Sequence, residues 1–151
     1  MARIGIITCS NVTQELGCVS SVCLSEIRER KGFFKDYHPD ENLDLVGIIN
    51  CSGCPTVGAP QKILRRVRAM ADLQVDAIHL SFCMTALCPF KHKYEEVIKE
   101  AYPNIKVVLG THTPGDPKDL QDDVKKLFCA DQLTLADLYY ERLKNQSLTT
   151  E

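Results

Sequence analysis

Four short runs of apolar, mostly β-branched residues recur between amphipathic stretches, and this alternation limits the possible folds more than any other feature. The runs are Arg3–Cys9, Leu43–Asn50, Asp76–Cys83 and Ile105–Gly110. Each is apolar on both faces, as expected for a strand of a parallel sheet that helices cover on both sides. We therefore predict a single-domain α/β fold. Its three-layer, doubly wound sheet is expected to resemble flavodoxin or Rossmann folds, mainly parallel, with about four strands in the order 2-1-3-4.

The stretches between the runs carry apolar residues at helical spacing. The predicted faces are Val19, Val22, Cys23 and Ile27 in a first helix, Ile63, Val67 and Met70 in a second after Pro60, and Phe90, Tyr94, Val97 and Ala101 in a third. Asp116 is expected to cap a fourth helix that begins at Pro117 and continues through Phe128. A last helix over Asp131–Lys144 would complete one domain over 1–144, followed by a polar tail over 145–151.

The charge balance limits the classes of partner. The chain has 18 Lys and Arg against 20 Asp and Glu, a formal net charge of -2. Nucleic acids and membrane surfaces are bound through basic surfaces, so we expect neither as a partner. The apolar start ends at Thr8 and is followed by polar Ser10, which makes it shorter than a signal-peptide core of about 7 to 15 residues. We therefore expect a cytoplasmic protein.

Cysteine is the unusual residue type, with 8 among 151 residues. A domain of this length builds its own core, and a reducing compartment disfavours disulfides, so the thiols indicate metal binding or thiol chemistry. Six candidate residues lie at or just after the carboxyl ends of the predicted strands: Cys9, Cys51, Cys54, Cys83, Cys88 and His112. The carboxyl ends of parallel strands share one edge, where such sheets bind ligands, so we expect these residues to meet there.

The spacing of the thiols favours a metal centre. Cys51 and Cys54 form a C-x2-C, and Cys83 and Cys88 form a C-x4-C. Four thiolates satisfy tetrahedral zinc or one iron–sulfur cluster, because both prefer soft sulfur ligands. Gly53 would allow the tight turn between the first pair. Cys88 is expected at a helix N-cap, where the helix dipole favours the thiolate.

The remaining candidates divide into two groups. Cys18 is a further possible ligand, because it is expected in the first helical turn, close to the same sheet edge, where the helix dipole favours the thiolate. Core packing explains Cys23 and Cys129 more simply. Among the other histidines, His79 is interpreted as a core residue, His92 as part of a solvated helix face and His38 as a turn residue. The basic run of Lys62, Arg65, Arg66 and Arg68 is interpreted as the solvated side of the second helix.

Over most of its length the chain resembles the CGGC domain family. The matching residues are Ile4–Cys9, Arg28–Phe33, Cys51–Pro55, Cys83, Cys88–Phe90 and Gly110–His112. Ser52 stands where the family usually has glycine. The family is described as a metal-binding domain with many cysteines and histidines, so the resemblance implies metal binding and leaves open whether the chain is an enzyme.

The sequence thus predicts a cytoplasmic protein that holds a thiophilic metal with Cys51, Cys54, Cys83 and Cys88, tuned by Cys9 and His112. Zinc is favoured over an iron–sulfur cluster, because a histidine is among the candidates. A thiol–disulfide oxidoreductase that uses Cys51 and Cys54 is the leading alternative. A metal delivery or storage protein is another. A small molecule or a redox partner would then act at the site. Neither a Cys-x5-Arg loop nor a G-x-G-x-x-G motif follows the strands, which disfavours phosphatase and dinucleotide-binding functions.

Overall fold

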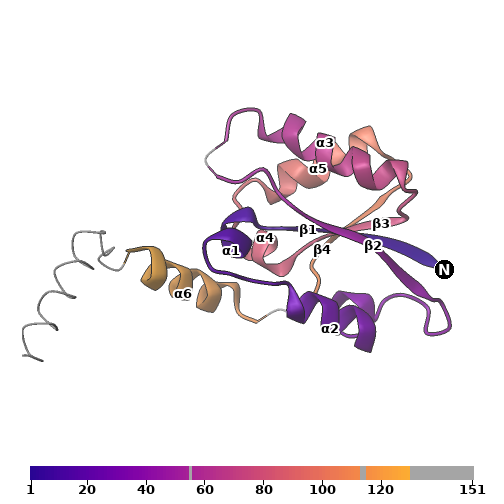
Figure 1. Cartoon of the computed structure of the whole chain (residues 1–151), viewed down its shortest axis with the longest axis horizontal. Helices are drawn as coiled ribbons and strands as arrows, with labels where there is room; N and C mark the ends of the chain where they lie inside the picture. Colours follow the sequence, from indigo (N-terminus) through magenta and orange to yellow (C-terminus); the bar gives the residue numbers. More distant parts are fainter. Residues whose placement is uncertain (55, 113–114, 130–151) are drawn as a thin grey trace, which may run out of the picture. The chain divides into compact units, whose positions relative to one another are not determined.

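The computed structural model describes residues 1–54, 56–112 and 115–129, and it contains one parallel sheet. The strands are β1 (Ala2–Thr8), β2 (Leu43–Asn50), β3 (Ala77–Leu80) and β4 (Lys106–Leu109). The helices are α1 (Ser10–Gln14), α2 (Ser21–Glu29), the short 3-10 helix η1 (Gly32–Phe34), α3 (Ala59–Asp72), α4 (Phe82–Leu87), α5 (Lys91–Ala101) and α6 (Pro117–Cys129). Every pairing is parallel and the strand order is β2-β1-β3-β4 (Figure 1). The predicted α/β fold and strand order are confirmed.

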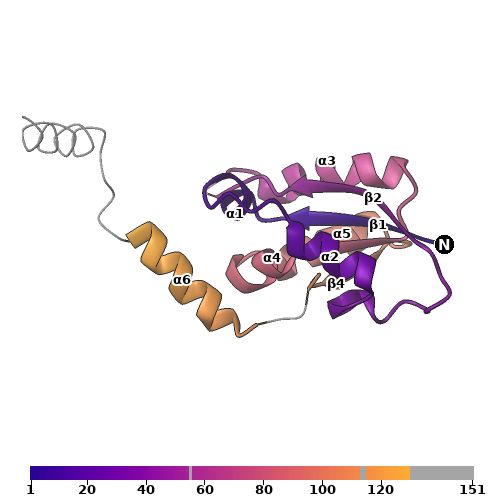
Figure 2. The same ribbon diagram turned by 60° about the horizontal axis from the view of Figure 1, so that its bottom comes forward.

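The sheet is the middle layer of three, and each face has its own apolar core. On one face, α3 and α5 pack against the strands through a cluster that includes Ile7, Ile63, Val67, Met70, Ile78, Tyr94 and Ile98. On the other face, α2 and η1 contribute Cys23, Ile27 and Phe34, which pack with Ile4 and Ile6. The turned view in Figure 2 keeps α2 and α3 on opposite sides of the strands. Successive side chains of a strand point to opposite faces, so a strand with two covered faces must be apolar throughout.

The helix α3 forms as its sequence predicts. Pro60 lies in its first turn, where its missing N–H has no helical partner to lose, and Ile63, Val67 and Met70 are buried at helical spacing. In α2 the prediction is only partly correct. The residue before the helix, Ser20, has a left-handed backbone (φ 58°), so Val19 precedes the helix and is exposed, as is Val22. The buried face of α2 consists of the other two residues predicted for it, Cys23 and Ile27.

The third predicted helix begins later than expected, and of its predicted face Tyr94 is buried and Val97 packs partly buried against the core. It is α5, which starts at Lys91, and Phe90 lies just before it with its side chain exposed. Tyr94 and Ile98 are its buried residues. They are four residues apart and therefore lie on one side of the helix, facing the sheet. The prediction that Ala101 belongs to the buried face is wrong, because this residue is exposed at the end of the helix.

The chain divides into two compact units, Met1–Leu120 and Gln121–Glu151. The first contains the sheet and the helices that cover it. The helix α6 begins in the first unit at Pro117, as predicted, and the Asp116 carboxylate accepts a hydrogen bond from the Lys118 N–H at 2.9 Å. In the second unit the described residues are the remainder of α6. The predicted helix over 131–144 and the tail over 145–151 lie outside the described residues. None of the described helices has the length and apolar composition needed to cross a membrane.

Candidate functional site

Three cysteines from three neighbouring strand ends meet at the carboxyl edge of the sheet. Cys9 follows β1, Cys51 follows β2, and Cys83 lies in the first turn of α4, after β3. The aligned register of the strands, in which Thr8 pairs with Asn50, brings these positions side by side. The Cys9 N–H donates to the Cys83 Sγ at 3.5 Å. The predicted convergence of these strand-end thiols is present in the structure, and we call Cys9, Cys51 and Cys83 the thiol cluster.

Within the cluster, the Cys51 sulfur is the anionic group and accepts hydrogen bonds from its neighbours. The Cys9 thiol hydrogen bonds to it, and the Ser10 backbone N–H donates to it at 3.3 Å. The bond from Cys9, together with backbone donors and the nearby Arg66, lowers the pKa of the Cys51 thiol to about 5 even though burial opposes ionisation. The same hydrogen bond, reinforced by burial, raises the pKa of Cys9. The neutral Cys9 thiol therefore donates a hydrogen bond to the Cys51 thiolate.

Cys54 and Cys88 flank the cluster on the side of Cys51. Both are close enough to interact electrostatically with each other, and Cys88 also interacts with Cys51. Cys54 is exposed, whereas Cys88 is partly buried against the core under α3 and α5. Burial raises the pKa of the Cys88 thiol. The turn between the first pair uses Gly53 with φ +84°, a left-handed conformation that glycine adopts without strain.

The prediction that Cys88 lies at a helix N-cap is wrong. The apolar run that was expected to form one strand contains β3 and then, after Ser81, the helix α4. Cys88 ends this helix with an extended backbone (φ -83°, ψ 117°). The following Pro89 explains this conformation, because proline sterically disfavours helical backbone in the residue before it. The start of α5 still acts on this thiol, because the backbone N–H of Phe90, the residue before the helix, hydrogen bonds to the Cys88 sulfur and opposes the effect of burial on its pKa.

Cys18 and Cys23 lie on the opposite flank of the cluster. Cys23 is buried in α2, with its thiol 3.2 Å from the Thr111 hydroxyl, and it interacts electrostatically with both Cys83 and Cys18. Cys18 is exposed in the segment before α2, so the prediction that it lies in the first helical turn is wrong. Cys23 packs in the core as expected and is, in addition, a neighbour of the cluster that sequence spacing did not assign to it.

The histidines differ from the thiols in their surroundings. His112 follows β4, and its ring packs against that of Phe82 at a centroid distance of 4.9 Å. His79 is fully buried in β3, as predicted for a core residue. His92 and His38 are exposed beside carboxylates of Glu95 and Asp40. Across the part of the chain that the structure describes, no three Cys, His, Asp or Glu side chains are positioned to hold one metal ion.

An open polar pocket adjoins the cluster and involves residues that the sequence analysis did not select. It has a volume of about 570 Å³, and Ser10, Asn11, Gln14, Asn50, Cys54 and Arg66 are among its lining residues, together with Cys51. Arg66 was interpreted as part of a solvated face, yet its Nε donates to the Asn50 carbonyl at 2.7 Å and the residue is half-buried. The position of Arg66 in the sequence could have indicated that it borders the buried face of α3, because it lies three residues after the buried Ile63 and next to Val67.

The family comparison agrees with this arrangement. The model of the CGGC domain matches residues 3–112, which include all four strands apart from Ala2 and every cysteine except Cys129. No curated protein and no solved structure shows significant similarity to the chain. The matched segment includes the strand-end cysteines, the C-x2-C turn and His112, and it extends over well over half of the sequence. The chain belongs to the CGGC domain family.

Proposed function

We propose that this protein binds one thiophilic metal centre at the carboxyl edge of its sheet. The observation that carries the proposal is the thiol cluster, in which Cys9 contacts thiols from both neighbouring strand ends. Soft thiolates are the preferred ligands of zinc and of iron–sulfur clusters. The family to which the chain belongs is described as metal binding, which supports the same conclusion.

In this proposal the ligands are Cys51, Cys54, Cys83 and Cys88, while Cys9 and His112 tune or complete the site and Cys18 is a further candidate. The chemistry of these donors fits a thiophilic metal. Their positions do not yet form a coordination sphere, so metal binding must draw the sulfurs closer together. The glycine turn between Cys51 and Cys54 and the exposure of Cys54 favour such a movement. Cys51 enters as the thiolate, the form that binds metal.

Zinc is the favoured metal, with an iron–sulfur cluster second. Zinc is favoured because a histidine such as His112 is a common zinc ligand. The large number of thiols keeps an iron–sulfur cluster as the second candidate. The proposed location is the cytoplasm, where the thiols stay reduced. Storage or delivery of the metal is an extension of the same proposal, and it predicts transfer of the ion to a chelator or partner protein without unfolding.

Metal analysis and the visible absorption spectrum of anaerobically purified protein test the proposal. Stoichiometric zinc in a colourless protein identifies a zinc site, and iron with sulfide in a brown protein identifies a cluster. The double variant Cys51→Ser, Cys83→Ser should lose the metal, because a hydroxyl does not supply a soft ligand. Cys129→Ser, which removes a cysteine that is not among the proposed ligands, is the matched control and should keep it. Full metal occupancy in the double variant would contradict the proposal.

A thiol–disulfide oxidoreductase is the second candidate, and the contact between Cys9 and Cys51 favours it. The Cys51 thiolate would attack a disulfide of a partner and form a mixed disulfide, releasing one partner thiol. Cys9, after losing its proton, would attack the Cys51 sulfur and release the second partner thiol. The partner disulfide is thereby reduced, and a Cys9–Cys51 disulfide is formed. Cys9 is better placed than Cys54 as the resolving thiol, because it contacts the Cys51 sulfur directly. Metal-free protein with this disulfide would support the second candidate.

A further inference from the structure

The pocket beside Cys51 offers a ligand one cationic group and several hydrogen-bonding side chains. Its lining is dominated by hydroxyl and amide side chains, and Arg66 is the one formally charged basic residue among those described. No carboxylate belongs to this described lining. Its volume of about 570 Å³ is within the range of about 300 to 1,000 Å³ that is typical of small-molecule sites. The Cys51 thiolate also lines the pocket, so the pocket suits a small polar molecule whose negatively charged group pairs with Arg66 while an uncharged part faces the Cys51 sulfur.

Arg66 is held in place and keeps donors for a ligand. The hydrogen bond from its Nε to the Asn50 carbonyl fixes the plane of the guanidinium at the pocket wall. Among the described residues, none accepts a hydrogen bond from its two terminal nitrogens. A guanidinium presents its N–H groups in a planar fork that matches the two oxygens of a carboxylate. Fixing the fork beforehand lowers the entropy cost of binding.

Asn50 supplies a second fixed donor. Its Oδ1 accepts hydrogen bonds from the hydroxyls of Thr8, at 2.6 Å, and Thr13, at 3.0 Å. Because both bonds go to the amide oxygen, the NH2 group is left to donate elsewhere. Asn50 and Arg66 both line the pocket, so these donors come from adjacent elements, the end of β2 and the helix α3.

We propose that this pocket binds a small molecule through a carboxylate group, which Arg66 and Asn50 hold while the rest of the molecule lies against the thiols of Cys51 and Cys54. The inference deepens the proposed function and rests on it for the role of the bound molecule, which is held beside the metal-binding thiols. The carboxylate is the shared chemistry of two sources, a peptide and a simple organic acid.

Calorimetric titration of the reduced, metal-free protein tests the proposal with three probes. S-methylglutathione supplies peptide carboxylates without a free thiol, succinate supplies the organic acid, and succinamide is its uncharged counterpart. We expect S-methylglutathione, succinate or both to bind, and succinamide to bind at least about tenfold more weakly, as the loss of a charged hydrogen-bonded pair implies. Failure of both carboxylates to bind, or equal binding of succinamide and succinate, would overturn the proposal without any variant.

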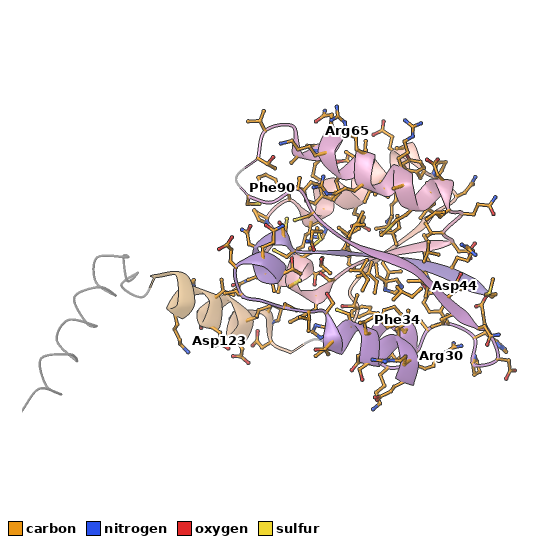
Figure 3. The ribbon with its side chains drawn as sticks, in the orientation of Figure 1. Arg30, Phe34, Asp44, Arg65, Phe90 and Asp123 are labelled. Atoms are coloured by element: carbon orange, nitrogen blue, oxygen red, sulfur yellow. The ribbon has the colours of Figure 1, made fainter. Side chains whose placement is uncertain are left out.

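Two arginines of α3 provide matched variants. Arg66→Gln should weaken binding of the carboxylate probe by about tenfold or more. Arg65→Gln should leave it unchanged, because Arg65 is exposed on the outer side of α3 (Figure 3). Far-ultraviolet circular dichroism checks that both variants are folded. Unchanged binding in folded Arg66→Gln would overturn the proposal.

Metal content separates this proposal from the function on which it rests. The comparison is made in the wild type, because Arg66 also helps to lower the pKa of the proposed ligand Cys51. If the wild type binds no metal but binds a carboxylate through Arg66, the proposed function is contradicted and the carboxylate site is supported. If metal is bound normally and no carboxylate binds, the pocket alone is overturned.

Discussion

At the scale of single residues, the hydrogen bond between Cys9 and Cys51 determines the chemistry of the thiols at the carboxyl edge of the sheet. A thiolate in a partly buried position needs donors, and the Cys51 sulfur has a neighbouring thiol and backbone N–H groups as well as Arg66 nearby. The partner thiol contributes most to the lowered pKa of Cys51. The reactivity of Cys51 should therefore depend on a residue that is distant in sequence and adjacent only in the fold.

The first prediction concerns this dependence. In metal-free Cys9→Ala, loss of the hydrogen bond should raise the pKa of Cys51 toward that of an ordinary thiol. Cys51 is a thiolate above its lowered pKa in the wild type, so the rise of its alkylation rate with pH should shift to higher pH in the variant. Mass spectrometry after timed alkylation measures this rate for each cysteine. Cys18→Ala is the control and should leave the profile of Cys51 unchanged. The same profile for Cys51 in wild type and Cys9→Ala would contradict the assigned role of Cys9.

A second prediction at the residue scale concerns His79. Burial lowers the pKa of its ring to about 4, so the ring is neutral near pH 7. Its Nδ1 donates to the Gly110 carbonyl at 2.7 Å, which leaves Nε2 to accept from the Tyr37 hydroxyl at 2.8 Å. The unfolded state, with a histidine pKa near 6.5, takes up the proton first as the pH falls. The contribution of His79 to stability is complete above about pH 6.5 and is lost as the pH falls toward 4.

The size of this effect can be measured by urea unfolding. Between about pH 7 and pH 5 the free energy of unfolding should fall by about 2 kcal/mol through His79 alone. In His79→Gln, which has no titrating ring, this part of the pH dependence should be absent. A wild-type stability that does not decline over this range, or an equal decline in His79→Gln, would show that the buried ring is not the group that titrates.

At the scale of elements, the segment that follows β4 depends on a glycine. Gly110 has φ +148°, and a Cβ at this position would lie 2.3 Å from the Phe33 ring carbon Cε2. The same segment is tied to η1, because the Phe33 N–H donates to the Thr111 carbonyl at 3.0 Å. An alanine would have to adopt an unfavourable backbone and displace a ring at once.

The third prediction follows from this crowding. Gly110→Ala should lower the free energy of unfolding by about 1 to 3 kcal/mol, through overpacking and backbone strain. Gly47→Ala is the matched control, because a Cβ there meets nothing within 4 Å. It should change stability little or increase it slightly. Chemical denaturation of both variants measures their free energies of unfolding. Equal values for the two would show that the segment after β4 can move away from Phe33 without cost.

The same scale explains which elements were predictable. The strands could be predicted because burial on two faces forces an uninterrupted apolar run, as in Ile4, Ile6 and Ile7, which face opposite cores. The helix α4 was missed because its apolar residues continue the run of β3. Ser81 marks the boundary, and serine is a common residue at helix starts, but an apolar run of this length fits a strand equally well.

At the scale of the whole molecule, topology made the site predictable in outline. Once a parallel sheet is expected, residues that follow its strands must meet at one edge, and this argument was sufficient for Cys9, Cys51 and Cys83. It could not give the closeness of Cys9 to Cys51, which depends on strand register, nor the role of Arg66. That arginine is selected by its contact with the Asn50 carbonyl, a contact between elements that no local pattern contains.

The fold itself should not depend on the metal, and this is the last prediction. The core cluster under α3 and α5 contains fully buried aliphatic residues such as Ile63, Val67 and Ile98, so the sheet has apolar cores independent of coordination. A small zinc finger, in contrast, lacks such a core and unfolds when the metal is removed. After chelation the far-ultraviolet circular dichroism should retain its helical signal, and thermal unfolding should remain cooperative. The midpoint should fall modestly, because a ligand that binds only the folded state stabilises it. Collapse of the helical signal on chelation would show that the thiol centre holds the sheet edge together, and would make the metal structural.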